Sequence, residues 1–569
     1  MFTYLKKLCY LVFHVFLSII IISFNIEKYD QLFCFCMIVI YLSILFHIIN
    51  IKNKIIKSVV NKRCIIYSII SLCFFLIMLP ISDILTNKIF INFSIINKIL
   101  FIVLLIYSWL YIFIFIINSS FKSIYSNRKT SNILIIIMVI ISLLFVMSTT
   151  TGYYDYDFPS IWNSINKDWC DMHPVAFIML VYVCKIFNTP YIIIIINFIL
   201  FIYFLWYSIK ILNRENQSNI ILIIYFLIYL FNIVQFDQLR FLNKDVIFSL
   251  SFCNLLISIF DYLLTKKFTK QIKINLIIFS FLVSIFRHGS IYLIILYFLI
   301  FIIKLIKIKD ICGLKFIMLN IIICLGLFSI VNYVGYRVYK IPHFDKNYSY
   351  TIPIYQIGAF ANNGYIFSLS DKQSLENNFY LPIEYMKNHF IQGDGDALTR
   401  TWRLDPIYAE HINDYNYNYL LKINFHLFID KPIFYIKSLL NMSQILWKIN
   451  GDNYFKTETY IDSNGNITYD VGIKETILAK PVNWVVNKGL KLCLFNIKIR
   501  GGISNFLIIV SLLIIIYKSR MDLLIPFILI FIWYLLLTIS IPMSNTRYCL
   551  PFINIYPFIV CLSLGIKTK

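Results

Sequence analysis

Charge is scarce in this chain. Only 14% of its 569 residues are Asp, Glu, Lys or Arg, whereas 60% are hydrophobic. Soluble proteins contain about 25% charged and 45–50% apolar residues. Glycine and proline are also few, at 16 and 14 residues, and no low-complexity tract occurs. Because a water-soluble core could not hide this much apolar surface, the composition excludes an ordinary soluble protein and favours a membrane protein.

Cysteine motifs are lacking as well. The 13 cysteines contain no CxxC pair, so no zinc site is predicted. Most lie inside apolar runs, where a thiol behaves as a small hydrophobic group. Only Cys170 and Cys493 fall in segments that we expect outside the membrane, and their spacing does not by itself argue for a disulfide.

Positive charge is plentiful but divided. The net charge of +23 is broken into short clusters between apolar runs, which is typical of membrane topology signals and not of a nucleic-acid-binding face. We therefore expect no nucleic-acid partner. Abundant Ile, Lys, Asn, Phe and Tyr indicate an AT-rich coding genome, which points to the cytoplasmic membrane of a bacterium.

Apolar runs of the length needed to cross a bilayer recur along the chain. We expect fourteen spans, at residues 8–24, 32–49, 64–82, 99–118, 132–149, 190–209, 218–236, 246–264, 274–286, 290–306, 313–334, 503–517, 521–541 and 548–566.

Lys and Arg gather in alternate connections, such as 52–63, 122–129, 266–273 and 304–309. The positive-inside rule then places these connections and both termini in the cytoplasm. This alternation holds only if residues 174–187 do not cross the membrane. That run of fourteen residues is short for a span and is more typical of a helix on the outer surface. We thus predict an all-α polytopic membrane protein with about 14 transmembrane helices and a large, mainly helical extracytoplasmic domain.

The predicted domain organisation has four parts. Residues 1–131 hold four N-terminal spans, and 132–334 form a membrane core with an outer loop at 150–189. Residues 335–502 form the extracytoplasmic domain, and 503–569 hold three C-terminal spans. Two stretches of the outer domain, 425–447 and 484–497, have the apolar spacing of amphipathic helices, some of which we expect on the membrane surface.

The first outer loop is rich in acids. Asp155, Asp157, Asp168 and Asp171 precede His173 within a short stretch beyond the fifth span. Carboxylates contribute little to membrane orientation, so this cluster suggests a general base or metal ligands at the surface. A merely solvated polar loop explains the spacing equally well. A tight turn at Phe158-Pro159 would fix the direction of Asp157.

Charged residues also gather at the outer ends of later spans. The segment 235–248 carries Asp237, Arg240, Lys244 and Asp245. Such charges are costly near a bilayer and usually face a cavity or one another.

The turn 286–290 carries Arg287 and His288, and Arg547 precedes the last span. Arginine suits phosphate oxygens through paired hydrogen bonds, although each arginine could instead extend to lipid headgroups. We consider Asp171, His173, Arg240, Lys244, Asp245, Arg287, His288 and Arg547 as substrate-binding candidates.

These segments resemble the GT-C superfamily of polyprenyl-phosphate-sugar-dependent glycosyltransferases, within it a bacterial branch with extra N-terminal spans. The similarity covers about residues 130–569. Its motifs appear in the order TGYYDYD, DMHP, LNKDVIF, FRHGS, PIYQIGAF, DKPIFYIKSLL and TRYCLP.

The resemblance implies a GT-C-like fold and a catalytic aspartate in the first outer loop. Asp157 matches this position best and Asp155 second. Phe158 stands where the family usually has a small hydroxyl residue, which leaves that choice open. FRHGS departs from the usual arginine-histidine-asparagine-glycine order, so Arg287 carries over better than His288.

The implied reaction is inverting sugar transfer from a polyprenyl-phosphate donor to a glycan, lipid or protein acceptor of the cell envelope, within membrane lipids. The aspartate would deprotonate the acceptor, and Arg287, Arg547 and Lys244 would stabilise the departing phosphate. No cofactor is certain, although the loop acids could hold a divalent cation. The alternatives are a cell-envelope polysaccharide polymerase or ligase, whose essential groups are mainly basic, and a lipid-linked oligosaccharide flippase.

Overall fold

A computed structural model describes much of the chain after residue 127. The described residues are 128–149, 152, 157–164, 173–215, 219–342, 350–378, 381–395, 398, 417–447, 476–492, 501–541 and 545–566. Within these ranges the regular elements are helices, and no strand is present. The predicted all-α class is thus confirmed for this part of the chain. The first four predicted spans lie outside the described residues.

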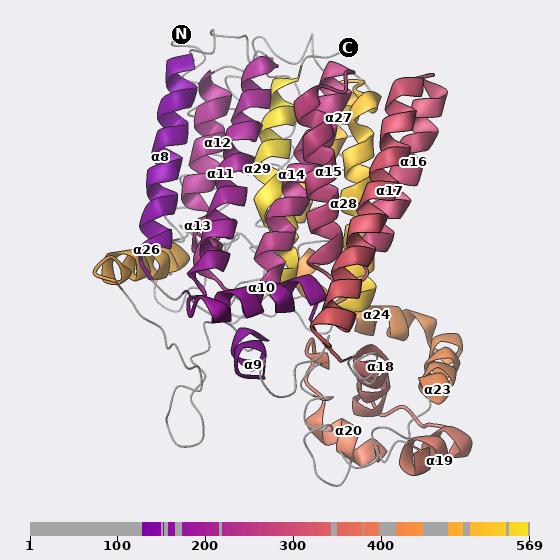
Figure 1. The fold of residues 1–569 in the computed structure, drawn as a ribbon. Coiled ribbons are helices and arrows are strands. Elements are labelled where there is room, and N and C mark those ends of the chain that lie inside the picture. Colours follow the sequence, from indigo (N-terminus) through magenta and orange to yellow (C-terminus); the bar gives the residue numbers. More distant parts are fainter. Residues whose placement is uncertain are drawn as a thin grey trace, which may run out of the picture.

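Each apolar run predicted as a span after residue 131 forms a helix, and these helices stand side by side (Figure 1). They are α8 (Arg128–Val146), α11 (Tyr191–Arg214), α12 (Asn219–Phe231), α14 (Lys244–Thr265), α15 (Lys270–Ile285), α16 (Ser290–Lys307), α17 (Ile311–Tyr333), α27 (Gly501–Tyr517), α28 (Leu524–Ser540) and α29 (Leu550–Gly565).

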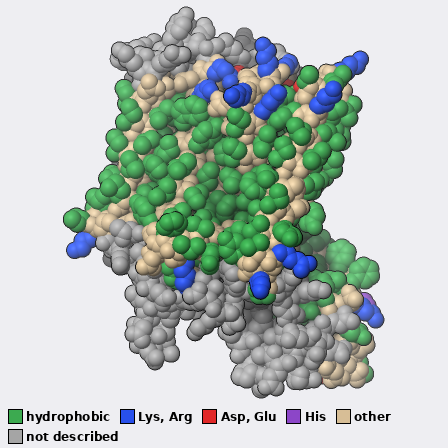
Figure 2. All heavy atoms as spheres, in the orientation of Figure 1, with side chains coloured by type: hydrophobic (Ala, Val, Ile, Leu, Met, Phe, Trp, Pro, Cys, Tyr) green, Lys and Arg blue, Asp and Glu red, His purple; other side chains and the backbone are tan. Residues whose placement is uncertain are grey.

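Six helical segments in the described part of the chain are long and apolar enough to cross a membrane. They contain α11, α14, α16, α17, α28 and α29, and α12 with the bent segment after it would make a seventh. Figure 2 shows a wide apolar belt on one face, with Lys and Arg side chains toward its two ends. The long apolar helices therefore fit a multi-pass membrane protein, while the count of fourteen spans stays a prediction.

Helix α14 lies at the centre of the bundle (Figure 1). Its residues from Asp245 to Leu263 are all buried, and it packs against α11, α15 and α29. Polar contacts fix it to the last helix, since Asn554 Nδ2 donates to Ser249 Oγ at 2.8 Å. The first residues of α14 are consequently held in the middle of one end of the bundle.

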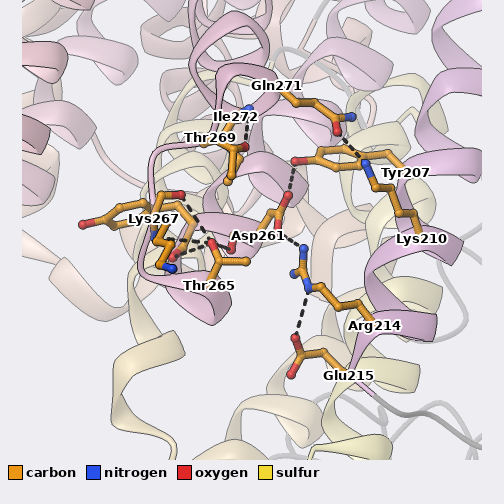
Figure 3. A network of polar contacts seen from close by, with 11 residues as sticks. Tyr207, Lys210, Arg214, Glu215, Asp261, Thr265, Lys267, Thr269, Gln271 and Ile272 are labelled. Atoms are coloured by element: carbon orange, nitrogen blue, oxygen red, sulfur yellow. Dashed lines mark hydrogen bonds and ion pairs between the residues drawn. The ribbon is translucent and has the colours of Figure 1, made fainter.

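The acidic residue near the other end of α14, Asp261, is paired (Figure 3). Asp261 accepts a hydrogen bond from the Tyr207 hydroxyl, and its Oδ1 lies 2.6 Å from Arg214 Nη1. Nearby, Lys210 Nζ donates to Gln271 Oε1 at 2.6 Å. These contacts join α11, α14 and α15, so we assign this network to the assembly of the bundle.

Helix α10 (Val175–Ile186) lies across the ends of the upright helices (Figure 1). Its Phe177, Ile178 and Val181 side chains are buried against the bundle. Residues 175–186 thus form a helix across these ends, as a surface helix would, while its place on the outer face of a membrane stays a prediction.

The short helix α9 (Asp157–Ser164) lies beside α10, whose Lys185 Nζ donates to the Trp162 carbonyl at 2.7 Å. The prediction of a tight turn at Phe158-Pro159 was wrong, because both residues lie inside α9. Proline fits the first turn of a helix, where its missing N–H needs no partner.

The helices between α17 and α27 lie largely beyond the same ends of the bundle as α10 (Figure 1). They include α18 (Thr351–Asn362), α19 (Leu369–Asn378), α20 (Ile383–His389), α23 (Tyr417–Asp430), α24 (Pro432–Met442), α25 (Gln444–Trp447) and α26 (Ala479–Leu492). A separate apolar core joins α18, α20 and α23. The stretch 425–447 is not one helix, because Pro432 starts a new one after Lys431.

Candidate functional site

Three segments that are far apart in the sequence meet at the end of the bundle where α14 begins. Asp245 lies in the first turn of α14, Arg287 in the α15–α16 turn, and Arg547 in the 3-10 turn η6 (Thr546–Cys549) before α29. Arg287 Nη1 lies 2.5 Å from Asp245 Oδ1, and Arg547 Nε lies 4.0 Å from Asp245 Oδ2. One carboxylate thus stands between two arginines.

The local sequence explains how Asp245 is held. Asn243 caps α14, and its side chain accepts a hydrogen bond from the Asp245 backbone N–H at 2.7 Å. Asparagine is a favoured capping residue, and an acidic side chain in the first turn is favoured by the helix dipole. The Asp245 side chain is only 3% exposed. Its carboxylate is therefore fixed at a buried helix start.

The FRHGS turn positions Arg287. Gly289 has a φ of 73°, a left-handed conformation that glycine adopts without steric cost. The buried Ser290 hydroxyl lies 2.6 Å from both the Val283 and the Arg287 carbonyl oxygens. This serine joins the end of α15 to the turn, so the backbone that carries Arg287 is tightly constrained.

Aromatic rings surround the Arg287 guanidinium. Its Cζ lies 5.5 Å from the Phe248 ring centre, 5.0 Å from Trp533 and 5.2 Å from Tyr548. Such contacts stabilise a cation, more so where water is excluded. Because Phe248 and Trp533 lie within α14 and α28, the guanidinium points into the bundle. This direction is opposite to an arginine that extends outward to lipid headgroups.

The second arginine shares one of these rings. Arg547 Nη2 donates to the Tyr548 hydroxyl at 3.1 Å, and its Cζ lies 5.1 Å from that ring. Tyr548 therefore contacts both cations.

Lys244 and His173 join the outer loop to this region. Lys244 Nζ lies 2.9 Å from His173 Nδ1, and His173 is buried just before α10. A lysine ammonium can only donate, so this contact requires an unprotonated Nδ1. Lys244, Arg287 and Arg547 thus lie around or next to Asp245. We call these four residues the basic cluster.

Arg240 pairs with an acid of its own segment, which is one of the two arrangements that the sequence left open. Its Nη2 pairs with Asp237 Oδ1 at 2.6 Å, and its Nη1 donates to Ser148 Oγ and Asn483 Oδ1 at 3.2 and 2.8 Å. The Arg240 and Asp237 side chains are each 5% exposed. Self-pairing therefore explains Asp237 and Arg240, whereas the neighbouring Lys244 and Asp245 pair with residues of other segments.

The remaining candidates are His288 and the acids of the first outer loop. His288 is exposed on the surface turn. Asp155 and Asp171 lie outside the described residues, and Asp157 is described only as the first residue of α9. Among the residues whose positions are described, no group of three or more His, Cys, Asp or Glu side chains could hold a metal ion.

Sequence reasoning missed the aromatic part of this region. Tyr548 follows Arg547 directly, and Phe248 lies one helical turn after Asp245, so both were within reach of a local pattern. Trp533 offers no such signal, because its contact with Arg287 joins helices that are distant in sequence. Comparisons of the chain with protein-family models, with curated proteins and with solved structures give no match.

Proposed function

We propose that this protein is a membrane glycosyltransferase that moves a sugar from a polyprenyl-phosphate donor to a cell-envelope acceptor at the outer face of the membrane. The observation that carries the proposal is the basic cluster. It gathers Arg287, Arg547 and Lys244 around Asp245 at the end of a bundle of long apolar helices.

The chemistry of this cluster suits a lipid phosphate. A polyprenyl chain would lie among apolar helices, and its phosphate would then be near their ends. Guanidinium groups pair well with phosphate oxygens, and buried placement strengthens that attraction. The leaving phosphate becomes a dianion when the sugar–phosphate bond breaks, so it would attract guanidinium groups more strongly than the donor does. Arg287 and Arg547 would therefore stabilise the leaving group more than the donor, which is the requirement for faster transfer.

The acceptor would be activated by an acid of the first outer loop. Asp157, or Asp155 in its place, would take the proton from the acceptor hydroxyl. The acceptor oxygen would then bond to the anomeric carbon with inversion, while the bond from that carbon to the phosphate oxygen breaks. Polyprenyl phosphate would leave with both bonding electrons. Burial of Phe158 and Trp162 holds α9 against the bundle, which supports a defined position for its first residue.

The location of the helices between α17 and α27 supports this arrangement. They lie beyond the same end of the bundle as the start of α14 (Figure 1). A domain at this end could bind an acceptor glycan or lipid, as the proposal requires.

The test is a transfer assay with the full chain in membranes. A labelled sugar is supplied on polyprenyl phosphate, and labelled glycan or lipid products are separated from the donor. The proposal predicts release of polyprenyl phosphate in step with labelled product, and loss of both in an Arg287→Ala, Arg547→Ala double variant. Absence of transfer from every polyprenyl-phosphate sugar tested, with a correctly inserted protein, would reject the proposal.

A polysaccharide polymerase is the second candidate, because its essential groups would also be basic. It would use a diphosphate-linked glycan as donor and would not need Asp155 or Asp157. Transfer from a diphosphate-linked glycan alone, unaffected by changing both aspartates, would favour that candidate.

A further inference from the structure

Helix α26 lies flat against the bundle at the end of α8 (Figure 1). One side of the helix packs inward, with Ala479, Val482 and Val486 nearly fully buried. The turn before it is fastened to the end of α8, where Thr476 N donates to the Ser148 carbonyl at 3.0 Å. The helix is thus held with its axis across the direction of the spans.

The other side of α26 is aromatic and basic. Trp484 is 61% exposed, and Lys480, one helical turn before it, is exposed as well. Tryptophan and lysine are the residues that favour the boundary between acyl chains and headgroups.

Helix α8 has an apolar outer face near this helix. That face exposes large apolar side chains along its length, at Ile133, Ile136, Ile140, Leu143, Leu144 and Met147. Met147 is 53% exposed, and its carbonyl accepts a hydrogen bond from Thr476 Oγ1 at 2.6 Å. The apolar face of α8 therefore ends where α26 begins, which places α26 at the level where a bilayer would end.

The inward side of α26 reaches a buried charge. Asn483 Oδ1 accepts the 2.8 Å hydrogen bond from Arg240 Nη1. Arg240 also pairs with Asp237 and belongs to the segment that leads into α14. A displacement of α26 would consequently remove one of the groups that hold Arg240.

We propose that α26 is an interfacial helix that binds anionic phospholipids. Trp484 inserts at the acyl boundary, and Lys480 contacts headgroup phosphates. The lipid layer thereby keeps Asn483 against Arg240. This inference does not depend on glycosyl transfer, since it rests on the placement of α26 alone.

The test uses tryptophan fluorescence of the full chain in lipid nanodiscs. The emission of Trp484 is obtained as the difference between the protein and its Trp484→Phe variant. Lipids brominated on the acyl chain should quench this difference, and aqueous iodide should quench it little. Trp206 on α11, which is 38% exposed on a predicted span, gives the matched difference with Trp206→Phe and should be quenched by brominated lipid as well.

Lipid preference is measured in the same way. Brominated phosphatidylglycerol, diluted in unlabelled phosphatidylcholine, should quench Trp484 roughly twofold more than brominated phosphatidylcholine at equal dilution, because each lysine near an anionic surface is favoured. Lys480→Glu should remove this difference. Lys387→Glu, the same change on the exposed side of α20, should leave it intact.

Three results would overturn the proposal. Quenching of Trp484 by iodide but not by brominated lipid would place α26 in water. Quenching by neither would mean that another part of the chain covers Trp484. Equal quenching by both lipids in the unaltered protein would remove the preference for anionic headgroups.

Discussion

The Arg287 guanidinium and the Asp245 carboxylate form an ion pair at 2.5 Å between a turn and a helix start that are brought together by folding. The pair lies among apolar helices, where charged groups are costly and a packed apolar pair would often be more stable. Its value to the protein therefore lies in keeping a cation at this position. Under the proposed function, Asp245 would hold and orient the arginines, which leaves the acids of the outer loop as candidates for the proton transfer.

Sugar transfer should require both the charge and the planar guanidinium group of Arg287. Arg287→Lys keeps the charge but loses the planar group that lies between Asp245 and the Trp533 ring. Sugar transfer should fall about tenfold or more in Arg287→Lys and further in Arg287→Ala, since one charged contact to a phosphate contributes roughly 1.5–3 kcal/mol.

The matched control for this loss is Arg520→Ala. Arg520 pairs with Asp522 in the turn before α28, so the variant removes an arginine–aspartate pair from a different segment. Its transfer rate should stay within twofold of the unaltered protein. Equal losses in Arg287→Ala and Arg520→Ala, at equal protein levels, would mean that Arg287 has no special part in transfer.

Asp245 and Arg287 should be energetically coupled. In a double-mutant cycle with Asp245→Ala and Arg287→Ala, we expect a coupling of the order of 0.5–3 kcal/mol in the free energy of unfolding. Each single change leaves a partly buried charge with fewer partners, so the double variant should be more stable than the two single effects would give. Unfolding in mixed detergent micelles, followed by circular dichroism, measures the cycle, and additive effects would contradict it.

Glycine at position 289 should be needed for its backbone conformation. Apart from its chain neighbours, no atom of the described residues lies within 4 Å of an added Cβ, so Gly289→Ala would cost mainly the left-handed strain of about 1–2 kcal/mol. Gly289→Asn should cost less, because asparagine tolerates this conformation better. In thermal unfolding in detergent, the unaltered protein should have the highest midpoint, Gly289→Asn a lower one and Gly289→Ala the lowest. Equal midpoints for the two variants would show that the φ of 73° is not what selects glycine here.

The placement of α10 predicts a topology. Reporter fusions at residues 160, 188 and 400 should lie outside the cytoplasm, and fusions at 58, 268 and 568 should lie inside. The fusion at 188 is decisive, because it follows α10 and precedes α11. A cytoplasmic signal at 188 together with an external signal at 214 would mean that α10 crosses the membrane.

The sequence predicted the positions of the helices better than the contacts between them. Run length set α10 apart from the predicted spans, because a run of about a dozen apolar residues is more often interfacial than spanning. Pro432 marks the division between α23 and α24 in the sequence, whereas the apolar spacing of residues 425–447 alone gives no sign of it. The contact of Trp533 with Arg287 could not be read at all, since it depends on how α28 packs against α14.

The candidate site shows the same limit. Charge at the ends of spans predicted that Lys244, Asp245, Arg287 and Arg547 matter, but it did not predict which groups would meet. Arg240 has the same residue type and a similar place in the sequence, yet its ion pair is with Asp237, three residues before it in the same segment. A single sequence gives no distance between segments, and that distance separates the basic cluster from a structural ion pair.

The most direct measurement is sugar transfer by Asp157→Asn, with Asp155→Asn and the double variant beside it. Asparagine keeps the size and removes the basicity, so the protein should insert and still bind the lipid donor. Transfer by Asp157→Asn should fall at least about a hundredfold, the lower range for a positioned general base. Asp155→Asn should have the smaller effect, and Glu384→Gln on α20 should have none. Full transfer by both single variants and by the double variant would contradict the account.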